Sequence, residues 1–178
     1  DVARFGTAFI EGVQSEKAIA TAKHFPGHGD TAVDSHRGLP IIDHSLSDLE
    51  KTELVPFRAA IKDGVASVMI AHIALPQIDG EVVTPLKNYR GGDAEVGAEI
   101  VDQKAYIPAT LSKKVQTDLL RNDMGFKGLI VTDAMSMSGL TLYFEQGEAG
   151  VRAFLAGSDL LEKPSDPDAM IAGILAAV

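Results

Sequence analysis

Three of the chain's five histidines lie in one short segment, together with lysine, aspartate and glycine residues. Lys23 and His24 end a run of small and apolar residues that is suited to a buried strand. A charged lysine at that place must face a polar site or pair with a carboxylate of the core. The nearby residues Pro26, Gly27 and Gly29 favour a sharp turn. We therefore expect Lys23 and His24 to line a site, with a structural ion pair of Lys23 as the alternative.

His36 follows Asp34 by two residues. A carboxylate beside an imidazole fixes its tautomer and raises its pKa, which suits a general acid or base near neutral pH. The same pattern also occurs on surface loops, so an incidental neighbour is the alternative for this pair.

Polar side chains end two further apolar runs. Asp133 follows residues 129–132, and an acidic group there is costly unless it faces a polar site. It could act as a nucleophile or a metal ligand, or it could only cap the next helix. His72 follows residues 68–71 and either contacts a substrate or forms hydrogen bonds at the strand end. Met135 could form an apolar wall for a ligand, although methionine is more commonly part of the packing.

Elements that can position these residues alternate along the chain. Nearly continuous apolar runs predict parallel strands buried on both faces. Capping residues, glycines and an Asp-Pro pair predict helices between and after them. The expected strands are 19–25, 67–73, 128–134 and 158–162. The expected helices are 2–13, one opened by a capping box at Ser47 and ended before Gly64, one from Ser112 to Met124 ended by Gly125, 145–156, and one that starts at Asp166-Pro167.

This alternation predicts an α/β fold, either a doubly wound sheet or a (β/α)₈ barrel. Polar residues at the carboxyl ends of several strands favour the barrel, whose mouth carries such residues. A barrel needs about 250 residues and eight strands, whereas this chain has 178 residues and four expected strands. We expect one domain over residues 1–178 that is the C-terminal part of a barrel, with an irregular insertion at about 77–107. Its remaining surface would need the N-terminal barrel half or a partner chain.

Composition narrows the function classes. The net charge of −9 disfavours binding to nucleic acid. The absence of cysteine excludes disulfides, thiolate nucleophiles and cysteine-based zinc sites. No apolar run is long enough to span a membrane. The compartment stays open between the cytoplasm and a secreted or periplasmic location.

The ordered series of motifs resembles family 3 glycoside hydrolases, in particular the bacterial N-acetyl-β-glucosaminidases (β-hexosaminidases). The motifs that carry the resemblance are KHFPGHG at 23–29, DSH at 34–36, VMIAH at 68–72, PATLS at 108–112 and TDAM at 132–135. The resemblance covers nearly the whole chain except the expected insertion. It implies a (β/α)₈ barrel that needs no cofactor and no metal.

The resemblance also implies site roles. A small carbohydrate would be the substrate, namely terminal β-linked N-acetylglucosamine in cell-wall muropeptides or chitin fragments. Retaining hydrolysis would proceed through a covalent glycosyl-enzyme on Asp133. His36 would be the acid/base with Asp34 as its partner, and Lys23 and His24 would hold sugar hydroxyls.

His72 and Met135 complete the expected substrate-binding residues because they flank the same strand ends. Three alternatives stay open beside this hypothesis. The first is a β-glucosidase of the same family, which the 34–36 loop disfavours because such relatives usually take their acid/base from a later domain. The second is a metal-dependent hydrolase, whose zinc ligands would be drawn from His24, His28, His36, His72 and Asp133. The third is a sugar-binding remnant without activity. Water or phosphate could be the acceptor.

Overall fold

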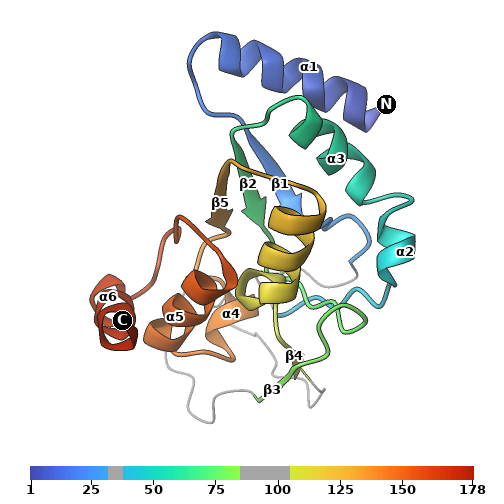
Figure 1. Cartoon of the computed structure of the whole chain (residues 1–178). Coiled ribbons are helices and arrows are strands. Elements are labelled where there is room, and N and C mark those ends of the chain that lie inside the picture. Colours follow the sequence, from blue (N-terminus) through green and yellow to red (C-terminus); the bar gives the residue numbers. More distant parts are fainter. Residues whose placement is uncertain (32–37, 85–104) are drawn as a thin grey trace.

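The computed structural model describes residues 1–31, 38–84 and 105–178. Three parallel strands, two short antiparallel strands and a set of helices alternate along the chain (Figure 1). The elements in chain order are α1 (Val2–Ser15), β1 (Thr21–Phe25), α2 (Leu46–Leu49), α3 (Leu54–Lys62), β2 (Ser67–Ile70), β3 (Val82–Val83), β4 (Ala105–Tyr106), the 3₁₀ turn η1 (Ala109–Leu111), the π-helix η2 (Lys114–Asp123), β5 (Leu129–Thr132), α4 (Ser138–Thr141), α5 (Gln146–Ala156) and α6 (Pro167–Ala177).

The main sheet has the order β1-β2-β5, and both strand pairs are parallel. The central strand β2 is the most apolar, and its Val68 and Ile70 are fully buried. Ile70 is paired with Thr132, so the carboxyl ends of β2 and β5 lie side by side. This register brings the residues that follow the two strands to one edge of the sheet.

The expected fourth strand is not formed. Within the described residues, segment 158–162 contributes only an isolated parallel bridge between Leu160 and Val131. The side chain of Asp159 takes the backbone N–H of Ile130 at 2.8 Å, which interrupts a regular ladder at this position. Within the described residues, the main sheet therefore has three strands in place of the four expected, and these strands do not form a closed barrel.

Most helix predictions agree with the structure. α1, α5 and α6 lie where they were expected, and Gly64, Gly125 and Gly157 all have positive φ after helical segments. The segment from Ser112 onward is helical, but as a π-helix, with the Ser112 hydroxyl accepting from the Val115 N–H.

The predicted capping box at Ser47 was wrong by two residues. Ser45 is the N-cap of α2, because its hydroxyl accepts from the Asp48 N–H at 3.2 Å. The helix also breaks after Leu49, so that two helices, α2 and α3, replace the single expected one.

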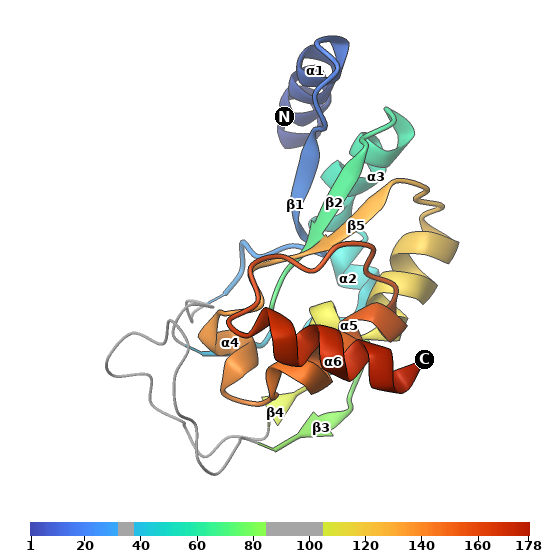
Figure 2. The ribbon, with the colours of Figure 1, turned by 90° about the vertical axis from the view of Figure 1, so that its left-hand side faces the viewer.

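Two apolar cores lie on either side of the strand ends. The first packs α1, α3 and η2 against the sheet and includes Phe25, Val68 and Ile130. The second includes Met135 and Leu140. In both views α4, α5 and α6 lie beyond the carboxyl ends of the strands (Figures 1 and 2). The second core contains Val83 and Ile107, the first contains η2 and β5, and the chain enters the second core again between β5 and α4.

The structure describes the two ends of the expected insertion. There β3 pairs with β4 in antiparallel fashion, and Ile107 is buried after β4. Among the described helices, none has both the length and the apolar character that a membrane span requires.

Candidate active site

Asp133 lies directly after β5, and both its backbone N–H and one of its carboxylate oxygens form hydrogen bonds with the backbone. Its N–H donates to the Ile70 carbonyl at 3.0 Å, which fixes it to the end of β2. Its Oδ1 accepts from the Ala134 N–H at 2.8 Å. Its Oδ2 lies 3.7 Å from Nε2 of His24. The carboxylate is therefore oriented by the backbone, and one oxygen faces the end of β1.

His24 lies near the end of β1 with its side chain partly exposed. Its ring packs edge-to-face on that of His28, with the ring centroids 6.0 Å apart. Burial lowers the pKa of His24, and repulsion from Lys23 and His28 adds to this, while the nearby Asp133 opposes it. A neutral imidazole of this kind can both donate and accept a hydrogen bond next to the carboxylate.

Lys23 is exposed and forms no hydrogen bond or ion pair within the described part of the chain. It contributes to the wall of a cavity of about 230 Å³ near α1, together with Phe9 and Phe57. The alternative role of Lys23 was a structural ion pair, and none of the described residues forms one with it.

His72 is fully buried, and both of its ring nitrogens have partners. Nδ1 lies 2.7 Å from the Thr110 hydroxyl, and Nε2 lies 2.9 Å from the Ala134 carbonyl oxygen. The structure therefore agrees with the second of the two roles considered for His72, which is hydrogen bonding at the strand end. The expected substrate contact of His72 needs an exposed ring, which the structure does not provide.

Met135 is also fully buried and belongs to the second core. Its N–H donates to the Glu162 carbonyl at 2.8 Å, and its carbonyl accepts from the Gln146 side chain at 3.0 Å. The side chain of Met135 therefore packs in the core and does not form the apolar wall that was expected for a ligand. Asp34 and His36 lie outside the described residues.

The sequence analysis did not predict a group of buried polar residues that lies beneath the site. Thr110, Gln116 and Ser158 have almost no exposed surface and are hydrogen-bonded to one another or to His72. A threonine inside the PATLS motif and a glutamine among the apolar residues of η2 were the available signals.

The zinc alternative needs a cluster of ligands. Within residues 1–31, 38–84 and 105–178, no group of three or more histidine and carboxylate side chains is placed to hold a metal ion. Of the proposed ligands, His36 lies outside these ranges and His72 already uses both nitrogens.

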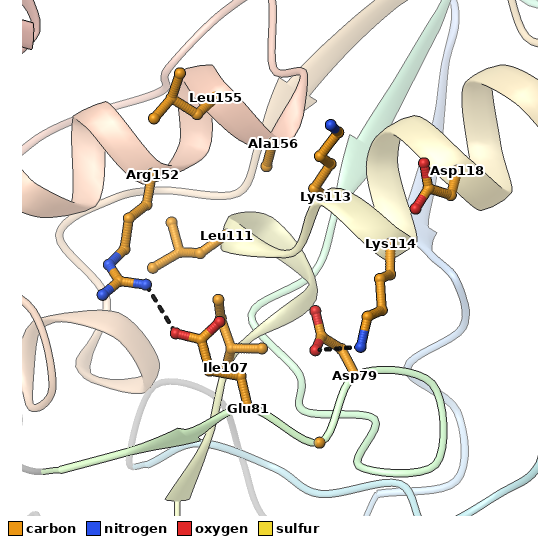
Figure 3. Close-up of a pocket in the computed structure, with 11 residues that line it drawn as sticks. Asp79, Glu81, Ile107, Leu111, Lys113, Lys114, Asp118, Arg152, Leu155 and Ala156 are labelled. Carbon is orange, nitrogen blue, oxygen red and sulfur yellow. Dashed lines mark hydrogen bonds and ion pairs between the residues drawn. The ribbon is translucent and has the colours of Figure 1, made fainter.

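A larger cavity of about 760 Å³ lies beside η2 and α5, and none of the expected site residues lines it. Figure 3 shows Arg152 pointing toward Glu81 and Lys114 toward Asp79. The first pair is 3.0 Å apart and the second 3.2 Å. The charges of this cavity thus largely compensate one another.

Comparisons with known proteins agree with the motifs. "Beta-hexosaminidase A" from Pseudoalteromonas piscicida is 35% identical over 164 residues, which cover 92% of this chain and 25% of that protein. "Beta-hexosaminidase" from Nitrosomonas eutropha is 32% identical over 94% of this chain and 40% of that protein. The chain thus spans less than half the length of these relatives.

A solved family 3 β-N-acetylglucosaminidase from Paenibacillus sp. is similar over 99% of this chain and 30% of that one. The TM-score is 0.82 at 38% identity. The α/β fold is therefore that of the family's N-terminal domain, which is similar to a (β/α)₈ barrel. The sequence model of the "Glycosyl hydrolase family 3 N terminal domain" matches residues 1–178, and the chain belongs to this family of glycoside hydrolases.

Proposed function

We propose that this chain supplies the catalytic residues of a retaining exo-glycosidase that removes terminal β-linked N-acetylglucosamine from muropeptide or chitin fragments. The observation that carries the proposal is the carboxylate of Asp133 at the carboxyl end of β5. One oxygen accepts from the Ala134 N–H, and the other faces His24. A carboxylate fixed in this way suits attack on a sugar. The relatives named β-hexosaminidase support the substrate class.

Asp133 is the nucleophile of the proposed mechanism. Its ionised carboxylate attacks the anomeric carbon as the glycosidic bond breaks, and a covalent glycosyl-enzyme forms. His36 gives its proton to the departing oxygen and then takes one from the incoming water, which releases the sugar. Asp34 stabilises the imidazolium and fixes its tautomer. Retention requires the donor and the nucleophile to lie about 5 Å apart across the bond.

His24 and Lys23 orient the sugar in this mechanism. Neutral His24 lies 3.7 Å from Asp133 and can bond a hydroxyl without removing the negative charge of the nucleophile. Lys23 has an exposed ammonium group that is not used by another described residue. Its assignment to sugar hydroxyls rests on the family resemblance, because the cavity that it lines lies beside α1 and α3.

We also propose that the chain is part of a larger barrel, of which it forms the later strands. Three parallel strands leave the β1 edge of the sheet unpaired within the described chain. Val2, Phe5 and Phe9 of α1 are each more than 60% exposed, which is unusual for large apolar side chains on one helix. Further strands, or a partner chain, would cover this face.

The experiment compares two substrates on the protein at its natural length. An aryl N-acetyl-β-glucosaminide and the matched aryl β-glucoside are each assayed with the native sequence and with Asp133→Ala, with and without a chelator. We expect turnover of the N-acetyl substrate that persists with the chelator and is lost in the variant. Turnover of the glucoside alone would favour a β-glucosidase. Loss of activity in the presence of the chelator would favour a metal-dependent hydrolase. Binding of the sugar without turnover would favour an inactive sugar-binding protein.

A further inference from the structure

A chain of buried hydrogen bonds runs beneath the candidate nucleophile. The Ser158 hydroxyl donates to Oε1 of Gln116 at 2.8 Å, and the Gln116 amide donates to the Thr110 carbonyl. The Thr110 hydroxyl lies 2.7 Å from Nδ1 of His72, whose Nε2 reaches the Ala134 carbonyl. Each of these four side chains is at most 4% exposed. Bulk water therefore cannot replace a missing partner in this chain.

The protons of this chain can be assigned from the chemistry of each group. A carbonyl oxygen only accepts, so Nε2 of His72 must carry a proton toward Ala134. The Thr110 hydroxyl has one proton, which can go either to Nδ1 of His72 or to the Ala71 carbonyl at 2.9 Å. The first choice leaves His72 neutral, whereas the second requires a proton on both of its nitrogens.

Burial favours the neutral form. His72 is enclosed completely, and this desolvation lowers its pKa. The bond to the Ala134 carbonyl and the charge of Asp133 oppose the shift, while His24 and His28 add to it. The neutral ring with its proton on Nε2 satisfies both ring nitrogens without a buried charge, and the Thr110 hydroxyl then donates to Nδ1 in place of the Ala71 carbonyl.

The carbonyl that His72 holds belongs to the residue that also orients Asp133. The Ala134 N–H donates to Oδ1 of Asp133 at 2.8 Å, while its carbonyl faces His72 at 2.9 Å. Rotation of this short segment would move the N–H and the carboxylate together. The position of the imidazole is therefore coupled to that of the reacting carboxylate.

We infer that His72 is a positioning residue, held as the neutral Nε2–H tautomer by Thr110, that orients the Asp133 carboxylate through the Ala134 carbonyl. The inference rests on the proposed function, in which Asp133 is the nucleophile. His72 touches neither substrate nor the reacting atoms. It differs from the expected substrate-binding role because it acts from beneath the site.

Imidazole ¹⁵N NMR of the natural-length protein tests the tautomer directly. His72→Gln identifies the signals, and Thr110→Val removes the hydroxyl at nearly constant volume. We expect a protonated Nε2 and an unprotonated Nδ1 at neutral pH, with the Nδ1 signal shifted by Thr110→Val. A doubly protonated ring, or a proton on Nδ1 alone, would overturn the inference.

Steady-state kinetics test the positioning. We expect His72→Leu to lower kcat by about 10-fold to 100-fold, with KM changed little, because a small displacement of a reacting group has effects of this size. His72→Gln can still donate to Ala134 and should recover part of kcat. Ser112→Ala is the matched control, since it removes another buried hydroxyl, which bonds Asp79 at 2.6 Å. It should lower the thermal stability and leave kcat unchanged.

The outcomes separate this inference from the proposed function. If Asp133→Asn keeps its activity, the proposed function fails, while the NMR experiment still reports the tautomer. If Asp133→Asn is inactive and folded His72→Leu retains the native kcat, the positioning role alone is wrong. Thermal unfolding of each variant shows that the compared proteins are folded.

Discussion

Two regions of the molecule are polar: the carboxyl ends of β2 and β5, and the 760 Å³ cavity beside η2 and α5. They differ in whether their carboxylates are paired with lysine or arginine side chains. In the cavity, Arg152 pairs with Glu81 and Lys114 pairs with Asp79. At the strand ends, one oxygen of the Asp133 carboxylate accepts from the Ala134 N–H, and the other faces His24, whose pKa is lowered by burial.

This difference, rather than the size of a cavity or its number of charges, is the reason that we place the candidate active site at the strand ends. A carboxylate already paired with a cation at the surface is stabilised as an ion and is a poor nucleophile. Among the described residues, the Asp133 carboxylate accepts from one backbone N–H and has no lysine or arginine partner, which keeps an electron pair available. We therefore expect similar substitutions in the two regions to have different effects on activity.

Substitution of the proposed nucleophile, Asp133, should give the largest effect. Asp133→Asn keeps an oxygen for the Ala134 N–H but cannot form the glycosyl-enzyme, so we expect kcat to fall on the order of 10⁴-fold or more. Asp118→Asn, an exposed carboxylate of the cavity, is the matched control and should leave kcat unchanged. Equal effects of the two variants would remove the distinction between the regions.

Substitution of the expected acid/base should give an effect that depends on the leaving group. We expect His36→Ala to lower kcat by about 10²-fold to 10⁴-fold on substrates with a sugar leaving group. Activated aryl substrates should be less affected in the first step, because an aryloxide departs without a proton. Stopped-flow and steady-state rates on both substrate types check this. A uniform decrease on both would argue against His36 as the proton donor.

The lowered pKa of His24 predicts the pH dependence of stability. An unfolded histidine gains its proton near pH 6.5, whereas folded His24 gains it only at lower pH. As the pH falls below about 6.5, the unfolded state binds more protons, so the free energy of unfolding decreases. Urea denaturation at about pH 7.5 and 5.5 should show a larger decrease for the native protein than for His24→Asn. An equal or smaller decrease would mean that His24 is not kept neutral by the fold.

The cavity ion pair should give the smallest effect. Glu81 and Arg152 are both substantially exposed, at 49% and 36% of the side chain. We expect Glu81→Gln to change the free energy of unfolding by about 0.2–1 kcal/mol and to leave kcat unchanged. Chemical denaturation and the aryl glycoside assay measure the two quantities. A large loss of activity would show that this cavity takes part in function.

Three strands and most helices could be predicted from the sequence because buried parallel strands and helix ends have strong local signals. The missing regular strand at 158–162 could not, since the side chain of Asp159 competes for the N–H of Ile130 across 29 residues. The shift of the cap from Ser47 to Ser45 is a choice between two serines that are separated by one residue.

The sequence was sufficient to predict which polar residues lie at the strand ends of the candidate site. Asp133 and His24 were chosen as polar residues after apolar runs, and the register of β1, β2 and β5 brings those ends together. The sequence left the choice between a ligand contact and burial open for His72 and Met135, because it depends on Thr110 and on the second core. Whether Asp34 and His36 meet Asp133 stays a prediction.

Mass spectrometry of a trapped intermediate tests the nucleophile most directly. In His36→Ala an activated aryl N-acetyl-β-glucosaminide can still react with Asp133, but the water that releases the sugar has lost its base, so the covalent species should accumulate. Rapid quenching and peptide mapping should then find one N-acetylhexosamine unit on Asp133. An adduct on another residue, or none during turnover, would contradict the account.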